Sequence, residues 1–361
     1  AAAEASEEQG ARLQLSERRC PRRGVARAFP RARASVRAVL VSRLLSAVSA
    51  SLPAGHDRAP GSRKASLPPG ASPRARTCVT QTRALTAVVG LYTASMNGEA
   101  ATMRSTRTRT SVSRLVLWDV DHTLIETGGV GREVYRTAFE AVTGRPLARM
   151  ADVTGATEPA LFRQTLRING LDERLATGLF GQFAVHQAAE YVARADELRR
   201  RGRVLPGVAQ ILAALHDDGG TVQTVVTGNT RESARVKLET FGLADLLDLA
   251  VGAYGTDSDD RADLVTLARE RVAAAYGVEI PVTATTLVGD TRGDVVAGVR
   301  AGVWTVGVAT GRTPVERLAA AGADVTFDDL SDRERVLRAL TGGERTMREP
   351  AVGALRRQTC R

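Results

Sequence analysis

Four aspartates in two short segments are the side chains of this sequence best suited to chemistry. Asp119 and Asp121 stand two residues apart after an apolar run, and Asp290 and Asp294 stand four residues apart after another. Two carboxylates spaced like the first pair can converge on one small site, one as nucleophile and the other as acid and base. The second pair can hold a hard cation through oxygen ligands, although Asp294 could equally cap a helix.

Groups that could bind an anion lie between those two segments. Thr227-Gly228-Asn229 offers a hydroxyl, a flexible glycine and backbone N–H groups at the start of an expected helix, which can cradle an anion. Arg261 opens a later expected helix and could reach a phosphate. By themselves these residues could be a helix cap and a surface arginine, so their weight comes from occurring together with the aspartates.

Short apolar strands that alternate with helices must position these residues. We expect strands at 114–118, 222–226, 249–252, 285–288, 304–308 and 324–327. We expect helices at 131–143, 158–170, 173–200, 208–216, 231–241, 263–276, 294–301, 315–321 and 332–340. This alternation predicts an α/β fold with right-handed crossovers and a doubly wound parallel sheet. Ligands of such sheets bind at the carboxyl ends of the strands, where most of the candidate residues fall.

The helices that follow the first strand have no strands among them and predict a separate unit. We therefore expect a core domain formed by residues 114–127 and 204–341, with a helical cap inserted at 128–203. Residues 342–361 read as a polar C-terminal tail.

The candidate residues together resemble the four motifs of the haloacid dehalogenase (HAD) superfamily. The matching residues are Asp119-Val120-Asp121-His122-Thr123, Thr227, Arg261, and Gly289-Asp290 through Asp294. The resemblance spans roughly residues 114–340 and is greatest to the phosphoglycolate phosphatase-like branch. It implies a Rossmann-like core with a small α-helical cap.

The resemblance also implies a mechanism. Asp119 would attack a phosphoryl group to give an aspartyl-phosphate, and Asp121 would protonate the leaving oxygen and then accept a proton from water. Mg²⁺ would bridge Asp119, the backbone carbonyl of Asp121 and Asp290, with Asp294 orienting the metal shell. The transferring oxygens would be held by Thr227, Gly228, Asn229 and Arg261.

The third motif departs from the family pattern. Its basic residue is usually a lysine in the family, whereas here it is Arg261. Arginine can still bind phosphate in a bidentate manner. Lys237 is the competitor for this position, but its place in the middle of an expected helix favours a surface role. Arg132, Thr157 and Arg163 are candidate cap residues for reading the substrate.

The residue at position 121 separates subclasses of the superfamily. The dehalogenases lack an acid there, because cleavage of a carbon–halogen bond needs no proton for the leaving group, so Asp121 favours phosphate chemistry. The phosphonate-cleaving relatives use a cap lysine, and residues 126–206 contain none. We therefore expect a Mg²⁺-dependent phosphatase acting on a small phosphomonoester, with a sugar-phosphate mutase as the alternative.

The net charge of +10 belongs to the first third of the chain. Residues 1–113 contain 19 of the 50 basic residues and 6 of the 40 acidic ones, a net of +13, so the remainder carries −3. The segment is rich in Arg, Ala, Ser and Pro without regular periodicity, which favours a disordered tail. The interpretation that we favour for its presence is translation from a misplaced start, with Met96 or Met103 as the true one.

Two further interpretations of this tail are a targeting peptide and a nucleic-acid-binding arm. If the tail is such an arm, the protein could be a non-enzymatic nucleic-acid binder. Few aromatic residues are present for base stacking, so the expected partner is a small phosphorylated metabolite rather than nucleic acid. No apolar stretch is long enough to span a bilayer, and we expect a cytoplasmic protein without a membrane partner. The sequence gives no signal for an oligomeric state.

Overall fold

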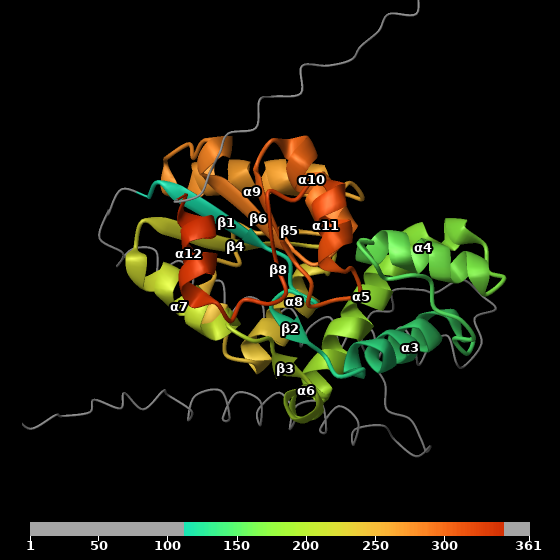
Figure 1. Cartoon of the computed structure of the whole chain (residues 1–361). Coiled ribbons are helices and arrows are strands. Elements are labelled where there is room, and N and C mark those ends of the chain that lie inside the picture. Colours follow the sequence, from blue (N-terminus) through green and yellow to red (C-terminus); the bar gives the residue numbers. More distant parts are fainter. Residues whose placement is uncertain (1–111, 343–361) are drawn as a thin grey trace, which may run out of the picture. The chain divides into compact units, whose positions relative to one another are not determined.

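A parallel β-sheet forms the centre of the protein. The computed structural model describes residues 112–342, and its main sheet has six strands in the order β5-β4-β1-β6-β7-β8 (Figure 1). The strands are β1 (Arg114–Trp118), β4 (Thr221–Thr227), β5 (Ala253–Tyr254), β6 (Thr285–Gly289), β7 (Trp304–Val308) and β8 (Val325–Phe327). All neighbouring strands pair in parallel, which confirms the predicted α/β fold.

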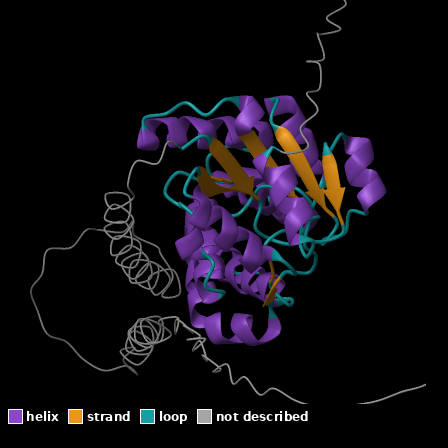
Figure 2. Ribbon diagram, turned by 60° about the vertical axis from the view of Figure 1, so that its left-hand side comes forward, coloured by secondary structure: helices purple, strands orange, loops and turns teal. Residues whose placement is uncertain are grey.

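Helices cover both faces of this sheet, as the purple ribbons around the orange strands show (Figure 2). They are α7 (Val208–Asp218), α8 (Arg231–Thr240), α9 (Arg261–Tyr276), α10 (Arg292–Ala301), α11 (Val315–Ala321) and α12 (Arg333–Thr341). One apolar cluster joins one face to α7, α8 and α12, and a second joins the opposite face to α9 and α10. Short 3-10 turns lie at Glu173–Leu175, Ala244–Leu246 and Val282–Ala284.

The central strand β1 shows why its sequence is an uninterrupted apolar run. Val116 and Trp118 belong to the cluster with α7, α8 and α12, whereas Leu115 and Leu117 belong to the cluster with α9 and α10. Successive side chains of a strand point to opposite faces, so a strand covered on both sides must be apolar at every position. The register pairs Trp118 with Val225 of β4 and Val288 of β6, and this brings three strand ends to one edge.

A helical unit follows β1 in the chain and packs around its own aromatic core. It contains α3 (Val130–Thr143), α4 (Glu158–Ile168), α5 (Ala176–Ala193) and α6 (Ala195–Arg201). Phe162 stacks on Phe183 with ring centroids 4.6 Å apart, and Tyr135 meets the edge of Phe183 at 4.9 Å. These rings hold the unit together away from the two clusters of the sheet.

A two-stranded ribbon that the sequence did not predict joins this unit to the sheet. Strand β2 (Ile125–Glu126) pairs antiparallel with β3 (Arg203–Val204), so that Ile125 faces Val204. Gly128 and Gly202 flank the ribbon, and a Cβ at either would overlap backbone atoms. Both passages of the chain between sheet and helical unit therefore lie side by side.

Two predicted elements differ from the structure. The expected helix at 173–200 is interrupted at Arg194, whose guanidinium pairs with Glu133 of α3 at 3.0 Å and Glu190 at 3.3 Å. The strand expected at 249–252 is instead β5, because Leu249 and Val251 pack into core clusters while Ala253 and Tyr254 pair with β4.

The expectations for residues 1–111 and 343–361 fall outside the described residues. They include most of the Arg-rich segment and its alternative start sites. Within residues 112–342, no helix combines the length and apolar character needed to cross a membrane.

The aromatic core of the helical unit predicts a large loss of stability in Phe183→Ala. Phe183 is fully buried and contacts Phe162 and Tyr135, so its removal leaves a cavity worth about 3–5 kcal/mol in the free energy of unfolding. Leu175→Ala is the control, since Leu175 is 46% exposed and its loss should change stability by less than about 0.5 kcal/mol. Urea unfolding measures both, and equal effects would contradict the packing described.

Candidate active site

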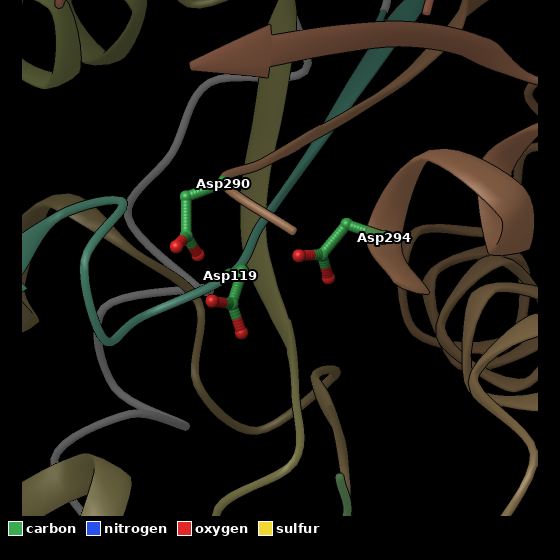
Figure 3. A group of neighbouring side chains, drawn as sticks. All are labelled: Asp119, Asp290 and Asp294. Carbon is green, nitrogen blue, oxygen red and sulfur yellow. The ribbon is translucent and has the colours of Figure 1, made fainter. Parts of the chain in front are cut away.

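Three aspartates from the predicted motifs meet at the carboxyl edge of the sheet. Asp119 follows β1, Asp290 follows β6, and Asp294 lies in the first turn of α10 (Figure 3). One carboxylate oxygen of each lies within 4.8 Å of the others, and all three side chains are buried. A cluster of this size and composition can hold a metal ion through oxygen ligands.

Glycines allow the backbone to come close to these carboxyl groups. A Cβ at Gly289 would overlap the side chain of Asp294, and a Cβ at Gly311 would overlap the carboxyl group of Asp290. The loop after β7 therefore borders the cluster together with the ends of β1 and β6. Sequence analysis identified Gly289 as part of a motif but gave no indication of Gly311.

Arg261 is the cation of the cluster. It is the first residue of α9, where the side chain of Asp260 caps the helix by accepting from the backbone N–H of Ala262. Its guanidinium lies 3.4 Å from Oδ1 of Asp119 and also pairs with Asp294. The structure thus brings the predicted third-motif arginine to the predicted nucleophile.

Asp294 caps a helix, which is one of the two roles that its sequence position left open, and it also lies in the acidic cluster. Its carboxylate accepts from the backbone N–H of Thr291 at 3.0 Å, while the Thr291 hydroxyl accepts from the backbone N–H of Asp294 at 3.1 Å. This capping box fixes the start of α10. Its other oxygen belongs to the acidic cluster and pairs with Arg261.

Burial and mutual repulsion raise the pKa values of two carboxyl groups in the cluster. Desolvation raises the pKa of Asp119, with Arg261 acting in the opposite direction. Desolvation, together with the charge of Asp119, raises the pKa of Asp290 to about 8. Buried carboxylates that lack enough positive charge hold protons more tightly, and a divalent cation would supply that charge.

Asp121 lies in a different environment from Asp119, although only one residue separates them. Its carboxylate accepts from the ammonium of Lys237 at 2.7 and 3.0 Å and from the side-chain amide of Asn229 at 2.9 Å. Burial alone would raise the pKa of Asp121, but Lys237 and Asn229 lower it overall. The same amide of Asn229 donates to the hydroxyl of Thr227 at 2.8 Å, which in turn hydrogen-bonds Asp119.

The surface role expected for Lys237 is wrong. Its side chain is buried, because it lies on the face of α8 that carries the small buried residues Ser233 and Ala234. Those residues precede it by four and three positions, so they share one helical face. The spacing of Lys237 from these two small residues was the signal in the sequence that could have predicted its burial.

The helical unit covers this edge of the sheet. The backbone N–H of Glu158, the first residue of α4, donates to the carbonyl of Gly228 at 2.8 Å. A Cβ at Gly228 would overlap the carbonyl of Ala156, so only glycine permits this approach. Burial raises the pKa of the Glu158 carboxyl to about 7, against the opposing effect of Lys237.

Two of the three candidate substrate-reading residues contact the same aspartate, and the third is exposed. The hydroxyl of Thr157 donates a hydrogen bond to the carboxylate of Asp259 at 3.1 Å. The guanidinium of Arg163 donates to the same carboxylate at 2.5 Å. Both thus link the helical unit to the loop that precedes α9. Arg132 lies exposed on α3.

Comparison with known proteins assigns the chain to a family. The model of haloacid dehalogenase-like hydrolases matches residues 116–298, half of the chain, and a HAD-hydrolase-like model matches 264–333. The chain belongs to the haloacid dehalogenase-like hydrolases. The resemblance predicted from the four motifs is confirmed, as is the prediction of a hydrolytic enzyme.

Individual relatives share a modest part of the sequence. The probable phosphatase IndB of Dickeya dadantii (strain 3937) is 29% identical over 221 residues, which is 60% of this chain and 90% of that protein. A hydrolase from Pseudomonas syringae is 21% identical with a TM-score of 0.47, covering 62% of this chain and 97% of its own. A structure described as a predicted phosphoglycolate phosphatase from Haemophilus somnus is 18% identical with a TM-score of 0.45, covering 63% and 99%.

The raised pKa of Asp290 predicts that a divalent cation binds more tightly as the pH rises. Below a pH of about 8 the Asp290 carboxyl group is protonated, and a cation that binds there must displace the proton. Below this pH, the affinity of the HAD enzyme for the cation should therefore increase about tenfold for each unit by which the pH rises. Isothermal titration calorimetry with Mg²⁺ in buffers of different ionisation enthalpy measures both affinity and released protons. Affinity independent of pH would contradict the shift.

The raised pKa of Asp290 also determines the direction in which the stability of the folded protein changes with pH. A carboxyl group whose pKa is raised in the folded state stabilises it below the ordinary value of 3.8, and this contribution is lost as the pH rises to about 8. The cation-free protein should therefore lose thermal stability over the upper part of this range. Mg²⁺ should restore more stability at the upper end of the range than at neutral pH.

Proposed function

We propose that this HAD hydrolase is a Mg²⁺-dependent phosphatase that hydrolyses a small phosphomonoester through an aspartyl-phosphate on Asp119. Membership of the family supports hydrolysis, and the relative in Dickeya dadantii that is named a probable phosphatase supports the phosphate ester as its target. Residues 114–127 and 204–341 would form the catalytic core, and residues 128–203 the cap over it.

The contrast between Asp119 and Asp121 is the observation that carries this proposal. Two carboxyl groups of one short turn lie in surroundings that shift their pKa values in opposite directions. By themselves these shifts favour a protonated Asp119 and an ionised Asp121, so Asp119 would need the positive charge of Arg261 and of a bound cation to act as the nucleophile. The different contacts of the two groups are what support two roles in one reaction. Asp119 lies beside Arg261 and the other acidic ligands, where a phosphoryl group would bind, while Asp121 is held apart by Lys237 and Asn229.

The two residues divide the reaction as follows. An oxygen of Asp119 attacks phosphorus, the bond to the leaving oxygen breaks, and Asp121 gives that oxygen its proton. Water then attacks the same phosphorus, Asp121 takes a proton from it, and the bond to Asp119 breaks to release inorganic phosphate. Between these steps Asp121 is a carboxylate, which is the form that the neighbouring ammonium stabilises.

The phosphoryl oxygens would be held by groups around Asp119. Thr227 and the backbone of Gly228 and Asn229 lie at the end of β4 beside the nucleophile, and Arg261 supplies a guanidinium. Positioning and charge neutralisation of this kind account for most of the catalysis of phosphoryl transfer.

The acidic cluster fits a resident Mg²⁺. Asp119 and Asp290 would contact it together with the backbone carbonyl of Asp121, and Asp294 would orient the shell while pairing with Arg261. The fit rests on the chemistry and closeness of three buried carboxyl groups, two of which have pKa values raised mainly by burial. When bound, the ion neutralises the repulsion between an anionic nucleophile and an anionic substrate.

The proposed substrate is a small phosphomonoester, as the resemblance to the phosphoglycolate phosphatase-like branch implies. A small phosphorylated metabolite suits a site that the cap covers so closely at Gly228. Product analysis separates hydrolysis from a mutase reaction, because a phosphatase releases one inorganic phosphate for each ester consumed. A screen of phosphorylated metabolites with that readout would identify the substrate.

Asp119→Asn should abolish hydrolysis of 4-nitrophenyl phosphate, because an amide cannot serve as the nucleophile. We expect kcat to fall on the order of 10⁴-fold or more. Asp217→Asn, on the exposed end of α7, is the matched control and should retain wild-type turnover. Undiminished turnover in Asp119→Asn would exclude this nucleophile.

Arg261 should tolerate lysine better than an uncharged side chain. Arg261→Met removes the cation beside Asp119 and should lower kcat/KM for the same ester about 10²–10³-fold, whereas Arg261→Lys keeps the charge and should lose less. Steady-state kinetics test the order of the two variants. A loss of equal size in both would mean that fork geometry, and not charge, is required.

A further inference from the structure

Lys237 is a buried charge that neither binds the phosphoryl group nor transfers a proton in the mechanism above. Lysine occurs at only two positions of the whole chain, Lys64 and Lys237, among 50 basic residues. The side chain of Lys237 is 4% exposed and comes from α8, on the opposite face of the sheet from Arg261. Burying an ammonium costs free energy unless its donors are used, so its contacts define what it does.

The ammonium group binds two residues of the candidate site. It donates to both carboxylate oxygens of Asp121, at 2.7 and 3.0 Å, and to the side-chain oxygen of Asn229 at 2.7 Å. Asn229 donates to Asp121 in turn, at 2.9 Å. Three side chains thus form a closed triangle of hydrogen bonds, and the carboxylate of Asp121 has donors from two directions.

The remaining side of the ammonium faces the helical unit. The ring of Tyr191, from α5, lies over it with the centroid 5.0 Å from Nζ. Tyr191 is itself buried, in a cluster that contains Val236 of α8 and Val130 and Val134 of α3. A cation over an aromatic face is stabilised without a further acceptor, so Lys237 has no unused side.

We propose that Lys237 is a positioning residue that holds the Asp121 carboxyl group in the orientation needed to exchange protons with the leaving oxygen and with water. This inference rests on the proposed function. Without the ammonium, Asn229 alone would restrain Asp121, and the carboxyl group could rotate about its side-chain bonds. Misplacement of a proton-transfer group by about 1 Å can cost 10²-fold in rate.

A series of esters with different leaving groups distinguishes this role from a merely structural one. 4-Nitrophenyl, phenyl and benzyl phosphates are similar in size, but their leaving oxygens need a proton to an increasing degree. Lys237→Met should lower kcat/KM about 10²-fold for benzyl phosphate and less than tenfold for 4-nitrophenyl phosphate. Asp121→Asn should show the same trend across the three esters.

Non-additivity provides the second criterion. If Lys237 acts through Asp121, Lys237→Met should add little to the loss already caused by Asp121→Asn. Arg235→Met is the matched control: it removes a cation from the same helix, and Arg235 pairs with Glu239 at 3.9 Å. This control should retain wild-type kcat/KM for all three esters.

The outcomes separate this inference from the function on which it rests. An equal loss for all three esters, or full additivity with Asp121→Asn, overturns the positioning role while leaving the phosphatase assignment intact. A wild-type enzyme that hydrolyses none of the esters or metabolites overturns the proposed function, and the inference with it.

Selective isotope labelling keeps the inference testable if Lys237→Met does not fold. Protein grown with lysine carrying ¹³C at Cε should give two signals, and Lys64→Arg identifies the one that belongs to Lys237. We expect that signal to be shifted by the Tyr191 ring and to move again in Asp121→Asn. A Lys237 signal at the position of an exposed lysine, unchanged in Asp121→Asn, would overturn the contact.

Discussion

Repulsion among buried carboxyl groups is the constraint on which the arrangement of this protein depends. The buried Asp119, Asp290 and Asp294 gather at one edge of the sheet beside the partly exposed Asp121, and the low dielectric there strengthens interactions between charges. The two faces of the sheet each supply one cation to this edge. Helix α9 brings Arg261 to Asp119 and Asp294, and α8 brings Lys237 to Asp121. Burial, with the repulsion of neighbouring carboxylates added to it, raises the pKa values of Asp119 and Asp290, and the two cations do not offset this effect.

Close backbone contacts determine how much room remains beside these charges. Gly228 lies against the carbonyl of Ala156, and Gly255 lies against the backbone of Gly228. The helical unit is further tied to the core at Asp259, which Thr157 and Arg163 both contact. The fold thus combines a charged edge of the sheet with a helical unit that contacts it at several points.

The sequence was most informative where a residue's environment follows from local pattern. The apolar run of β1 and the strand ends that follow it predicted where Asp119, Asp290 and Arg261 would meet, because parallel strands place their carboxyl ends together. Lys237 was misjudged because burial of a charge depends on which residues of other elements face it, here Asp121 and Tyr191. The ribbon of β2 and β3 was missed for a similar reason: two residues on each side carry too short a pattern to distinguish a strand from a loop.

The ribbon also limits how the helical unit can move. A body joined to another by two separate loops can shift in several directions, whereas here both crossings are bonded to each other through Ile125 and Val204. Such a pair bends and twists as a single unit, and Gly128 and Gly202 both lie at its end toward the helical unit. Displacement of the four helices would accordingly be a rotation about one short axis. A rotation of this kind would have to break the contacts of Thr157 and Arg163 with Asp259, whereas Val130, close to the ribbon in the chain, would move little.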